Sequence, residues 1–277
     1  MQSTVVRQSV QPTSTTRRFP LRRLLRITAP LITFAIIISI WQIVAALEVY
    51  PSFLLPPPAD VIEKFYEVTI GEGRVSLWVH LWATLQAVLG GLLTGLVAAV
   101  VLGYMIAKIP LLEDFLSPIV VAFQATPVVA YAPLLVIWFG SGIESKVITS
   151  ALIVFFPTLM NTIVGVRSVP GSLTDLMRSL NATPRQTMLK LEIPAAAPVL
   201  IGGLKVSATL AVIGAVVGEF VSAKAGLGFL INIGRNQYDM PLVIVAVLTL
   251  TLMALVLYGL VVLLEHFALA WRKRARL

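Results

Sequence analysis

The chain has 277 residues, of which 58% are hydrophobic and only 12% are charged, and its mean hydropathy is +0.93. This composition excludes an ordinary soluble globular domain and favours a bundle of membrane-spanning helices, whose backbone polar groups are satisfied internally. The net charge of +8 does not indicate nucleic-acid binding, since the basic residues gather at the ends of apolar runs, as a membrane surface requires.

A basic segment opens the chain. Residues 1–16 are rich in Ser, Thr, Gln and Val without an apolar period, and five arginines follow between Arg17 and Arg26. The pattern is similar to the start of a signal peptide, but no small-residue cleavage site follows and the next apolar run is long enough to remain as an anchor. We therefore expect residues 1–26 to form a basic, partly disordered cytoplasmic segment that stays in the mature protein.

About six apolar segments reach the roughly 20 residues that cross a hydrocarbon core. The expected spans are 27–47, 80–107, 111–139, 146–166, 195–221 and 240–267. Pro127 and Pro133 interrupt the third segment, which predicts a broken or kinked span. Together the spans define a transmembrane domain over residues 27–270, followed by a basic cytoplasmic tail at 271–277.

The distribution of lysine and arginine predicts the orientation. If the N-terminus is inside, the inner segments hold fifteen of the 21 basic residues, the outer segments hold five, and Lys205 lies within the fifth span. An excess of cations on the inner side is the usual pattern in membrane proteins. Both termini, and the polar loop between the fourth and fifth spans, are therefore expected in the cytoplasm.

That loop, residues 170–194, predicts two short helices joined by a turn. Leu173, Leu176, Met177 and Leu180 have the spacing of one apolar helical face, so a first helix should end near Leu180. Asn181 suits the left-handed conformation of a turn better than most residues other than glycine.

The second short helix should begin at a capping box. Thr183, Pro184 and Gln186 supply the capping residue, a proline at the first helical position and a glutamine three residues after the cap. This helix should run from about 184 to 192 and end before Pro194. The resulting helix-turn-helix is either an amphipathic connector on the membrane surface or a docking element for a cytoplasmic partner.

The loop resembles the cytoplasmic signature of binding-protein-dependent ABC transporter permeases. That signature has Glu-Ala-Ala, a glycine six positions after the Glu, and an Ile-x-Leu-Pro ending; in this chain the spacing is kept by Asp175, Leu176, Met177, Asn181, Leu191, Ile193 and Pro194. The residue types depart from it, with Asp for Glu, Leu-Met for Ala-Ala and Asn for Gly. The segments LLPPPADVI, TPVVAYAPLLVIWFG, IGAVVGEF and GLGFLI extend the similarity to the importer group for nitrate, sulfonates, taurine and thiamine precursors.

The resemblance implies an all-α integral membrane fold of about six transmembrane helices with a cytoplasmic coupling helix-turn-helix. It also implies two copies of an ABC ATPase subunit, an extracytoplasmic substrate-binding protein and a second permease copy, in the inner membrane of a prokaryote. The Glu position of the signature, held by Asp175, is expected to meet a basic residue of the ATPase, and we add Arg178 and Arg185 as exposed contact candidates. No phosphate-binding loop of the Gly-x-x-x-x-Gly-Lys type occurs, so ATP and Mg should bind to the partner and not to this chain.

Four polar residues within the expected spans are candidates for the translocation pathway. Glu219 is costly to bury in a membrane, and it either lines the pathway or contacts a neighbouring helix. Gln124, Thr126 and Asn161 either contact solute or form hydrogen bonds between helices.

Catalytic and metal-binding constellations are missing from the sequence. There is no cysteine, and the two histidines, His80 and His266, are expected at opposite faces of the membrane. We therefore expect a transport subunit without enzymatic activity that moves a small polar or anionic organic solute, namely a sulfonate, taurine, nitrate or a pyrimidine or riboflavin-type vitamin. The alternative is a secondary transporter driven by an ion gradient, which usually has internal repeats and an ionisable relay.

Overall fold

The computed structural model describes residues 21–71 and 75–270, and side chains from residue 28 onward. Every regular element in these ranges is a helix, which confirms the predicted all-α class. The tail at 271–277, and the predicted basic segment 1–26 apart from the backbone of its last six residues, lie outside this description.

Within the described residues, five helices are long and apolar enough to cross a membrane, and a bent pair brings the number to six when it is counted as one span. The five are α1 (Leu21–Ala46), α3 (Leu77–Lys108), α6 (Ile143–Arg167), α9 (Ile193–Val221) and α11 (Met240–Ala268). The bent pair joins α4 (Pro110–Ala125) to η1 (Val128–Tyr131) and α5 (Ala132–Phe139) through an 86° change of direction. The expected break at Pro127 is thereby confirmed, since proline fixes its own φ and cannot donate to the preceding turn.

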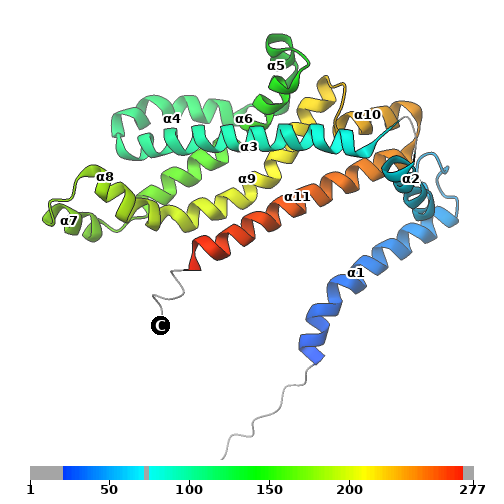
Figure 1. Cartoon of the computed structure of the whole chain (residues 1–277), viewed down its shortest axis with the longest axis horizontal. Coiled ribbons are helices and arrows are strands. Elements are labelled where there is room, and N and C mark those ends of the chain that lie inside the picture. The colour runs from blue at the N-terminus through cyan, green and yellow to red at the C-terminus, as the bar shows by residue number, and fades with distance from the viewer. Residues whose placement is uncertain (1–20, 72–74, 271–277) are drawn as a thin grey trace, which may run out of the picture.

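Shorter helices connect the spans at the two ends of the bundle (Figure 1). At one end lie α7 (Gly171–Ser179) and α8 (Pro184–Thr187), followed by the π-helical turn η2 (Met188–Glu192). At the other end lie α2 (Pro58–Ile70) and α10 (Leu227–Gln237). We call these the α7 end and the α10 end of the bundle.

The centre of the bundle is a close packing of α6 between α3 and α9. A Cβ added to Gly95 of α3 would lie 2.7 Å from the Ala151 carbonyl oxygen of α6, and one added to Gly214 of α9 would lie 2.5 Å from the Ser150 Cα. Ser150 Oγ also donates a hydrogen bond to the Ala211 carbonyl of α9 at 2.9 Å. These approaches let the three backbones pack with little freedom to slide.

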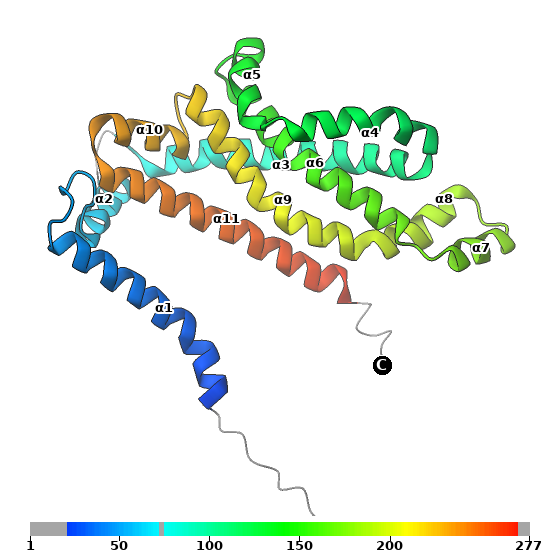
Figure 2. The same ribbon diagram turned by 180° about the vertical axis from the view of Figure 1, so that it is seen from behind.

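Helix α1 lies apart from this centre. Figures 1 and 2 show it running away from α11, with its nearest approach beside α2. No residue of its apolar window is buried by the part of the chain that the structure describes. Lipid or another protein must therefore cover this helix.

Candidate functional site

The turn after α7 has the geometry that Asn181 predicted. Asn181 has φ of +51°, and its N–H donates to the Arg178 carbonyl at 2.9 Å, while the Ala182 N–H donates to the Met177 carbonyl at 2.9 Å. These two bonds form a Schellman motif, the usual end of a helix that closes on a left-handed residue. The first helix of the predicted pair therefore ends where expected, at Ser179.

The capping box at α8 is also confirmed. The Gln186 N–H donates to Thr183 Oγ1 at 3.3 Å, and the Thr183 N–H donates to Gln186 Oε1 at 2.8 Å. Pro184 occupies the first helical position, where its missing N–H leaves no bond unmade. The two helices are thus oriented by turn and cap, and a free linker does not separate them.

The prediction that the second helix ends before Pro194 is wrong. Residues Pro184–Val221 form one continuous helical segment, in which α8 passes through η2 directly into α9. The N–H of Ile193 bonds back five residues, to the carbonyl of Met188. This wider turn changes the hydrogen-bond register just before Pro194, so the helix passes a residue that cannot donate.

The apolar side of α7 is uncovered by the described chain. Leu173, Leu176 and Leu180 are 41%, 53% and 67% exposed, and only Met177 is partly buried. Asp175 and Arg178 are exposed on the same helix, with a 3.4 Å contact that adds little stability in water. Together with the exposed Asp175 and Arg178, these leucines make α7 and the residue that caps it an exposed amphipathic surface.

The remaining signature residues lie nearer to the bundle. Arg185 is exposed on α8, whereas Leu191 and Pro194 are partly buried where η2 joins α9. The residues of the predicted coupling set thus occupy two places. One group projects from the α7 end, and the other lies at the joint that carries it.

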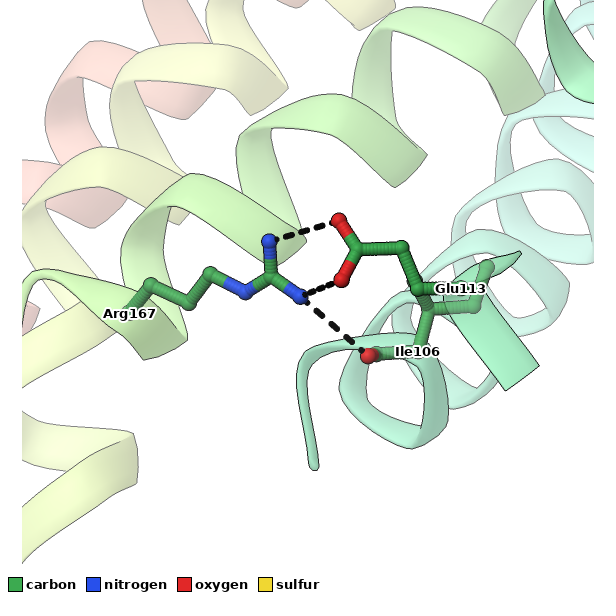
Figure 3. A network of polar contacts seen from close by, with 3 residues as sticks. All are labelled: Ile106, Glu113 and Arg167. Carbon is green, nitrogen blue, oxygen red and sulfur yellow. Dashed lines mark hydrogen bonds and ion pairs between the residues drawn. The ribbon is translucent and has the colours of Figure 1, made fainter. Parts of the chain in front are cut away.

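Sequence reasoning missed a charged contact at the start of the loop. Arg167, the last residue of α6, donates through its two terminal nitrogens to the two carboxylate oxygens of Glu113 in α4, at 2.8 and 2.5 Å. One of these nitrogens also reaches the Ile106 carbonyl of α3 at 3.5 Å (Figure 3). Arg167 therefore ties α6 to the corner where α3 turns into α4. The partners are 54 residues apart, so no local pattern could have revealed them.

A second charged contact holds the end of the loop. Glu192, in η2, is buried, and its carboxylate accepts a hydrogen bond from the Tyr104 hydroxyl at 2.8 Å and pairs with the Lys108 ammonium. Both partners belong to the last turns of α3. The loop therefore leaves the bundle at Arg167 and returns at Glu192, and both residues are held by the same corner.

The four pathway candidates do not meet in one site. Gln124 lines a groove of about 480 Å³ between α4 and α6, which Glu113 and Arg167 also line. Thr126 ends α4 at the bend, and Asn161 packs against Gly203 of α9.

Glu219 lies at the α10 end in a packed polar cluster. It is 1% exposed, accepts from the Thr84 hydroxyl at 2.8 Å and accepts from the Gly228 N–H at 2.7 Å. Thr84 Oγ1 in turn accepts from the Leu227 N–H at 2.7 Å. These bonds fasten the start of α10 onto α3 and α9, and every carboxylate oxygen has a partner.

The chain is similar in sequence to a known protein family. Residues 91–268 match the family described as binding-protein-dependent transport system inner membrane component. The chain belongs to this family. It is therefore a membrane permease subunit of a binding-protein-dependent ABC importer, as the signature loop predicted.

Relatives of this permease are named for different substrates. The riboflavin transport system permease protein of Chloroflexus aurantiacus is 44% identical over 240 residues, which cover 87% of this chain and 88% of that protein. The formylaminopyrimidine transport permease protein of Halalkalibacterium halodurans is 33% identical over 88% of this chain and 96% of that protein. The taurine transport system permease protein of Escherichia coli is 28% identical over 87% of both.

A solved structure shows the same fold. The permease overlaps a chain of the inward-facing MetNI methionine ABC transporter with a TM-score of 0.62, over 69% of this chain and 97% of that one. Sequence identity is 18%, so the likeness concerns the helical architecture alone. This structural similarity confirms the predicted all-α membrane fold.

Proposed function

We propose that this permease admits a riboflavin-type vitamin, or a pyrimidine precursor of a vitamin, by alternating access driven by ATP. The substrate class is supported by identity to the riboflavin permease, 44%, which exceeds the 28% identity to the taurine permease. The mechanism is supported by the helix-turn-helix at the α7 end, whose uncovered leucines are the observation that carries the proposal.

The loop 170–194 is the docking element for an ABC ATPase. Leu173, Leu176 and Leu180 enter an apolar groove of the partner, and Asp175, Arg178 and Arg185 at its rim select and orient the contact. Met177 and Asn181 shape the helix end that makes this surface rigid, and Leu191 and Pro194 lie at the joint that transmits its movement. A helix closed by a Schellman motif and followed by a capping box transmits displacement that a flexible loop would absorb.

We propose an assembly in which a separate ATPase, present in two copies, binds ATP and Mg. The absence of a phosphate-binding loop from this sequence supports that division of roles. A second permease copy completes the pathway and a binding protein delivers solute from outside. The excess of basic residues supports a cytoplasmic location for the α7 end and for both termini, and the membrane is the inner membrane of a prokaryote on this proposal.

The bend of the third span supports the substrate class. At this bend the Phe123 ring centroid is 6.2 Å from that of Tyr131 and 6.3 Å from that of Phe156. Gln124 and Thr126 follow Phe123 closely in the sequence. A group of aromatic rings suits a planar heterocycle better than a sulfonate anion. Asn161 and Glu219 hold helices together on this proposal, since their contacts lie within the bundle.

The coupling part is tested by replacing Asp175 and Arg178 together with alanine. We expect riboflavin uptake into proteoliposomes to fall about tenfold while ATP hydrolysis persists, because small changes in a transmitting contact alter coupling by about 0.5–2 kcal/mol. Asp114→Ala, an exposed charge on α4, is the control and should change neither quantity. Unchanged uptake by a normally assembled double variant would contradict docking through α7.

The energy source and the substrate are tested with the same vesicles. Uptake of labelled riboflavin should continue when the proton gradient is collapsed and ATP is kept, whereas a gradient-driven carrier would stop. Uptake of taurine in place of riboflavin would contradict the substrate class and leave the mechanism standing.

The orientation is tested with an Arg185→Cys variant, which contains the single cysteine of the chain because the natural sequence has none. A membrane-impermeant maleimide should label it in inverted vesicles and not in intact cells. Labelling of intact cells would place the α7 end outside and end the proposal.

A further inference from the structure

The joint between the docking element and the bundle is a single π-helical turn with a buried charge. Glu192 closes this turn, and its side chain is 4% exposed. Its partners, Tyr104 and Lys108, come from a different helix, 88 and 84 residues away in sequence. π-Helical turns in proteins are rare and are found mostly at functional positions.

Packing alone does not hold this joint to α3. A groove of about 270 Å³ runs along it, lined among others by Tyr104, Met188 and Glu192. Elsewhere α3 packs directly against α6 at Gly95, and α6 packs directly against α9 at Gly214. The polar contact of Glu192 therefore links η2 to α3 beside this groove.

Only the Glu192 half of this pair is buried, since the Lys108 side chain is 41% exposed, so the pair itself adds little stability while the buried carboxylate is costly to leave without a partner. Such pairs can specify one geometry among several, because each charge is costly to leave without its partner. Here the specified geometry is the angle at which α8 enters α9. If that angle is fixed, a displacement of α7 is passed on to the bundle. If it is not fixed, the displacement bends η2 instead.

We propose that Glu192 is a positioning residue for coupling, which through Tyr104 and Lys108 makes the α7–α8 pair and α9 move with α3 as one body. The inference rests on the proposed docking of residues 170–194 on an ATPase. Without the contact, η2 flexes and absorbs part of the displacement that ATP binding produces. The solute-binding step is unaffected, because Glu192 lies at the α7 end, away from the bend at Thr126.

Distance measurements between spin labels test the joint directly. The natural chain has no cysteine, so labels at Ser172 of α7 and Leu93 of α3, both exposed, report the angle without further changes. In the complex with its ATPase, assembled with an excess of unlabelled permease so that each complex carries one labelled copy, the wild-type pair should give one narrow distance distribution with and without ATP. Glu192→Gln should broaden it about twofold or more, whereas a pair at Leu93 and Ile213, both on the packed helices, should stay narrow in either protein.

Transport gives a second readout. Glu192→Gln should lower riboflavin taken up per ATP hydrolysed about tenfold with the KM for uptake unchanged. The matched control is Glu265→Gln, which removes the carboxylate that pairs with Lys205 at 2.6 Å between α9 and α11, and it should alter neither coupling nor the distance distribution. Exchanging the charges, with Lys108→Glu and Glu192→Lys together, should restore much of what either change alone removes.

The outcomes separate this inference from the proposed function. A wild-type complex that moves no riboflavin contradicts the proposed substrate, while the distance distributions still test the joint. A transporting wild type with a Glu192→Gln variant that keeps both a narrow distribution and full coupling overturns the positioning role alone. If Glu192→Gln does not assemble, Tyr104→Phe replaces it, because this change removes one hydroxyl from the same contact. The distance distribution and the uptake per ATP are then measured on that variant, with the same expected results.

Discussion

The guanidinium of Arg167 contacts both carboxylate oxygens of Glu113, so that the last residue of α6 is fastened to the first turn of α4. The contact joins the stem of the docking loop to the span that bends at Thr126. Arg167 also reaches the Ile106 carbonyl of α3, so the end of α6 is held to both helices of the α3–α4 corner.

Replacing Arg167 with lysine should loosen the first turn of α4. Lysine presents a single charged group and cannot form two parallel hydrogen bonds with one carboxylate. Amide hydrogen exchange in residues 112–117 should become a few-fold faster, while exchange in the middle of α6 stays the same. Arg178→Lys is the control, since its contact with Asp175 is 3.4 Å long and exposed. Equal exchange in the two variants would show that the forked contact does not hold α4.

The turn at Asn181 should tolerate glycine and resist valine. Its φ of +51° lies in the left-handed region, where a β-branched side chain clashes with its own backbone at a cost of about 1–2 kcal/mol. We expect Asn181→Val to speed amide exchange in residues 178–183 about tenfold, and Asn181→Gly to leave it unchanged or slower. A valine variant that exchanges like the wild type would mean that the turn adopts another conformation.

Two glycines of α9 offer a matched test of the bundle centre. Gly214→Ala places a Cβ 2.5 Å from the Ser150 Cα and should destabilise the fold by about 1–3 kcal/mol. Gly202→Ala meets no atom within 4 Å and should be neutral or slightly stabilising, since alanine favours helix. Thermal unfolding in detergent compares them, and similar midpoints for the two variants would contradict the close approach of α6 and α9.

The contact between α2 and α11 should be insensitive to pH over the physiological range. Lys64 Nζ lies 2.8 Å from Glu67 and 3.0 Å from Asp239, and the hydrogen bond to Glu67 is the main cause that raises the pKa of Lys64 above its ordinary value of 10.5. A raised pKa means that the protonated lysine stabilises the folded state below 10.5 and that this contribution is lost only as pH rises beyond it.

We expect Lys64→Met to cost at most about 1 kcal/mol, because the group is partly solvated. The difference from the wild type in unfolding free energy should be constant from pH 6 to pH 9 and shrink above about 10.5. A difference that already disappears between pH 6 and pH 9 would rule out the lysine as its source. Glu63→Gln, an exposed neighbour on α2, is the control.

Local patterns in the sequence were sufficient for the spans and for the turn before α8. Long apolar runs, the proline break at Pro127, the left-handed residue Asn181 and the capping box at Thr183 each depend on neighbours within a few positions, and the structure confirms all four. The end of the second loop helix was predicted wrongly because Pro194 was expected to stop it, and the π-helical turn that accommodates proline has no recognised sequence pattern.

What only the tertiary structure decided is which distant side chains meet. Glu113 finds Arg167, and Glu192 finds Tyr104 and Lys108, across 54 to 88 residues, through the packing of α3 and α6 that glycine permits. Hydrophobicity by itself determined that the chain crosses a membrane, because each span must satisfy its own backbone. Hydrophobicity could not determine which charged residues link the spans, because a charge pairs with the residues that the folded structure places next to it.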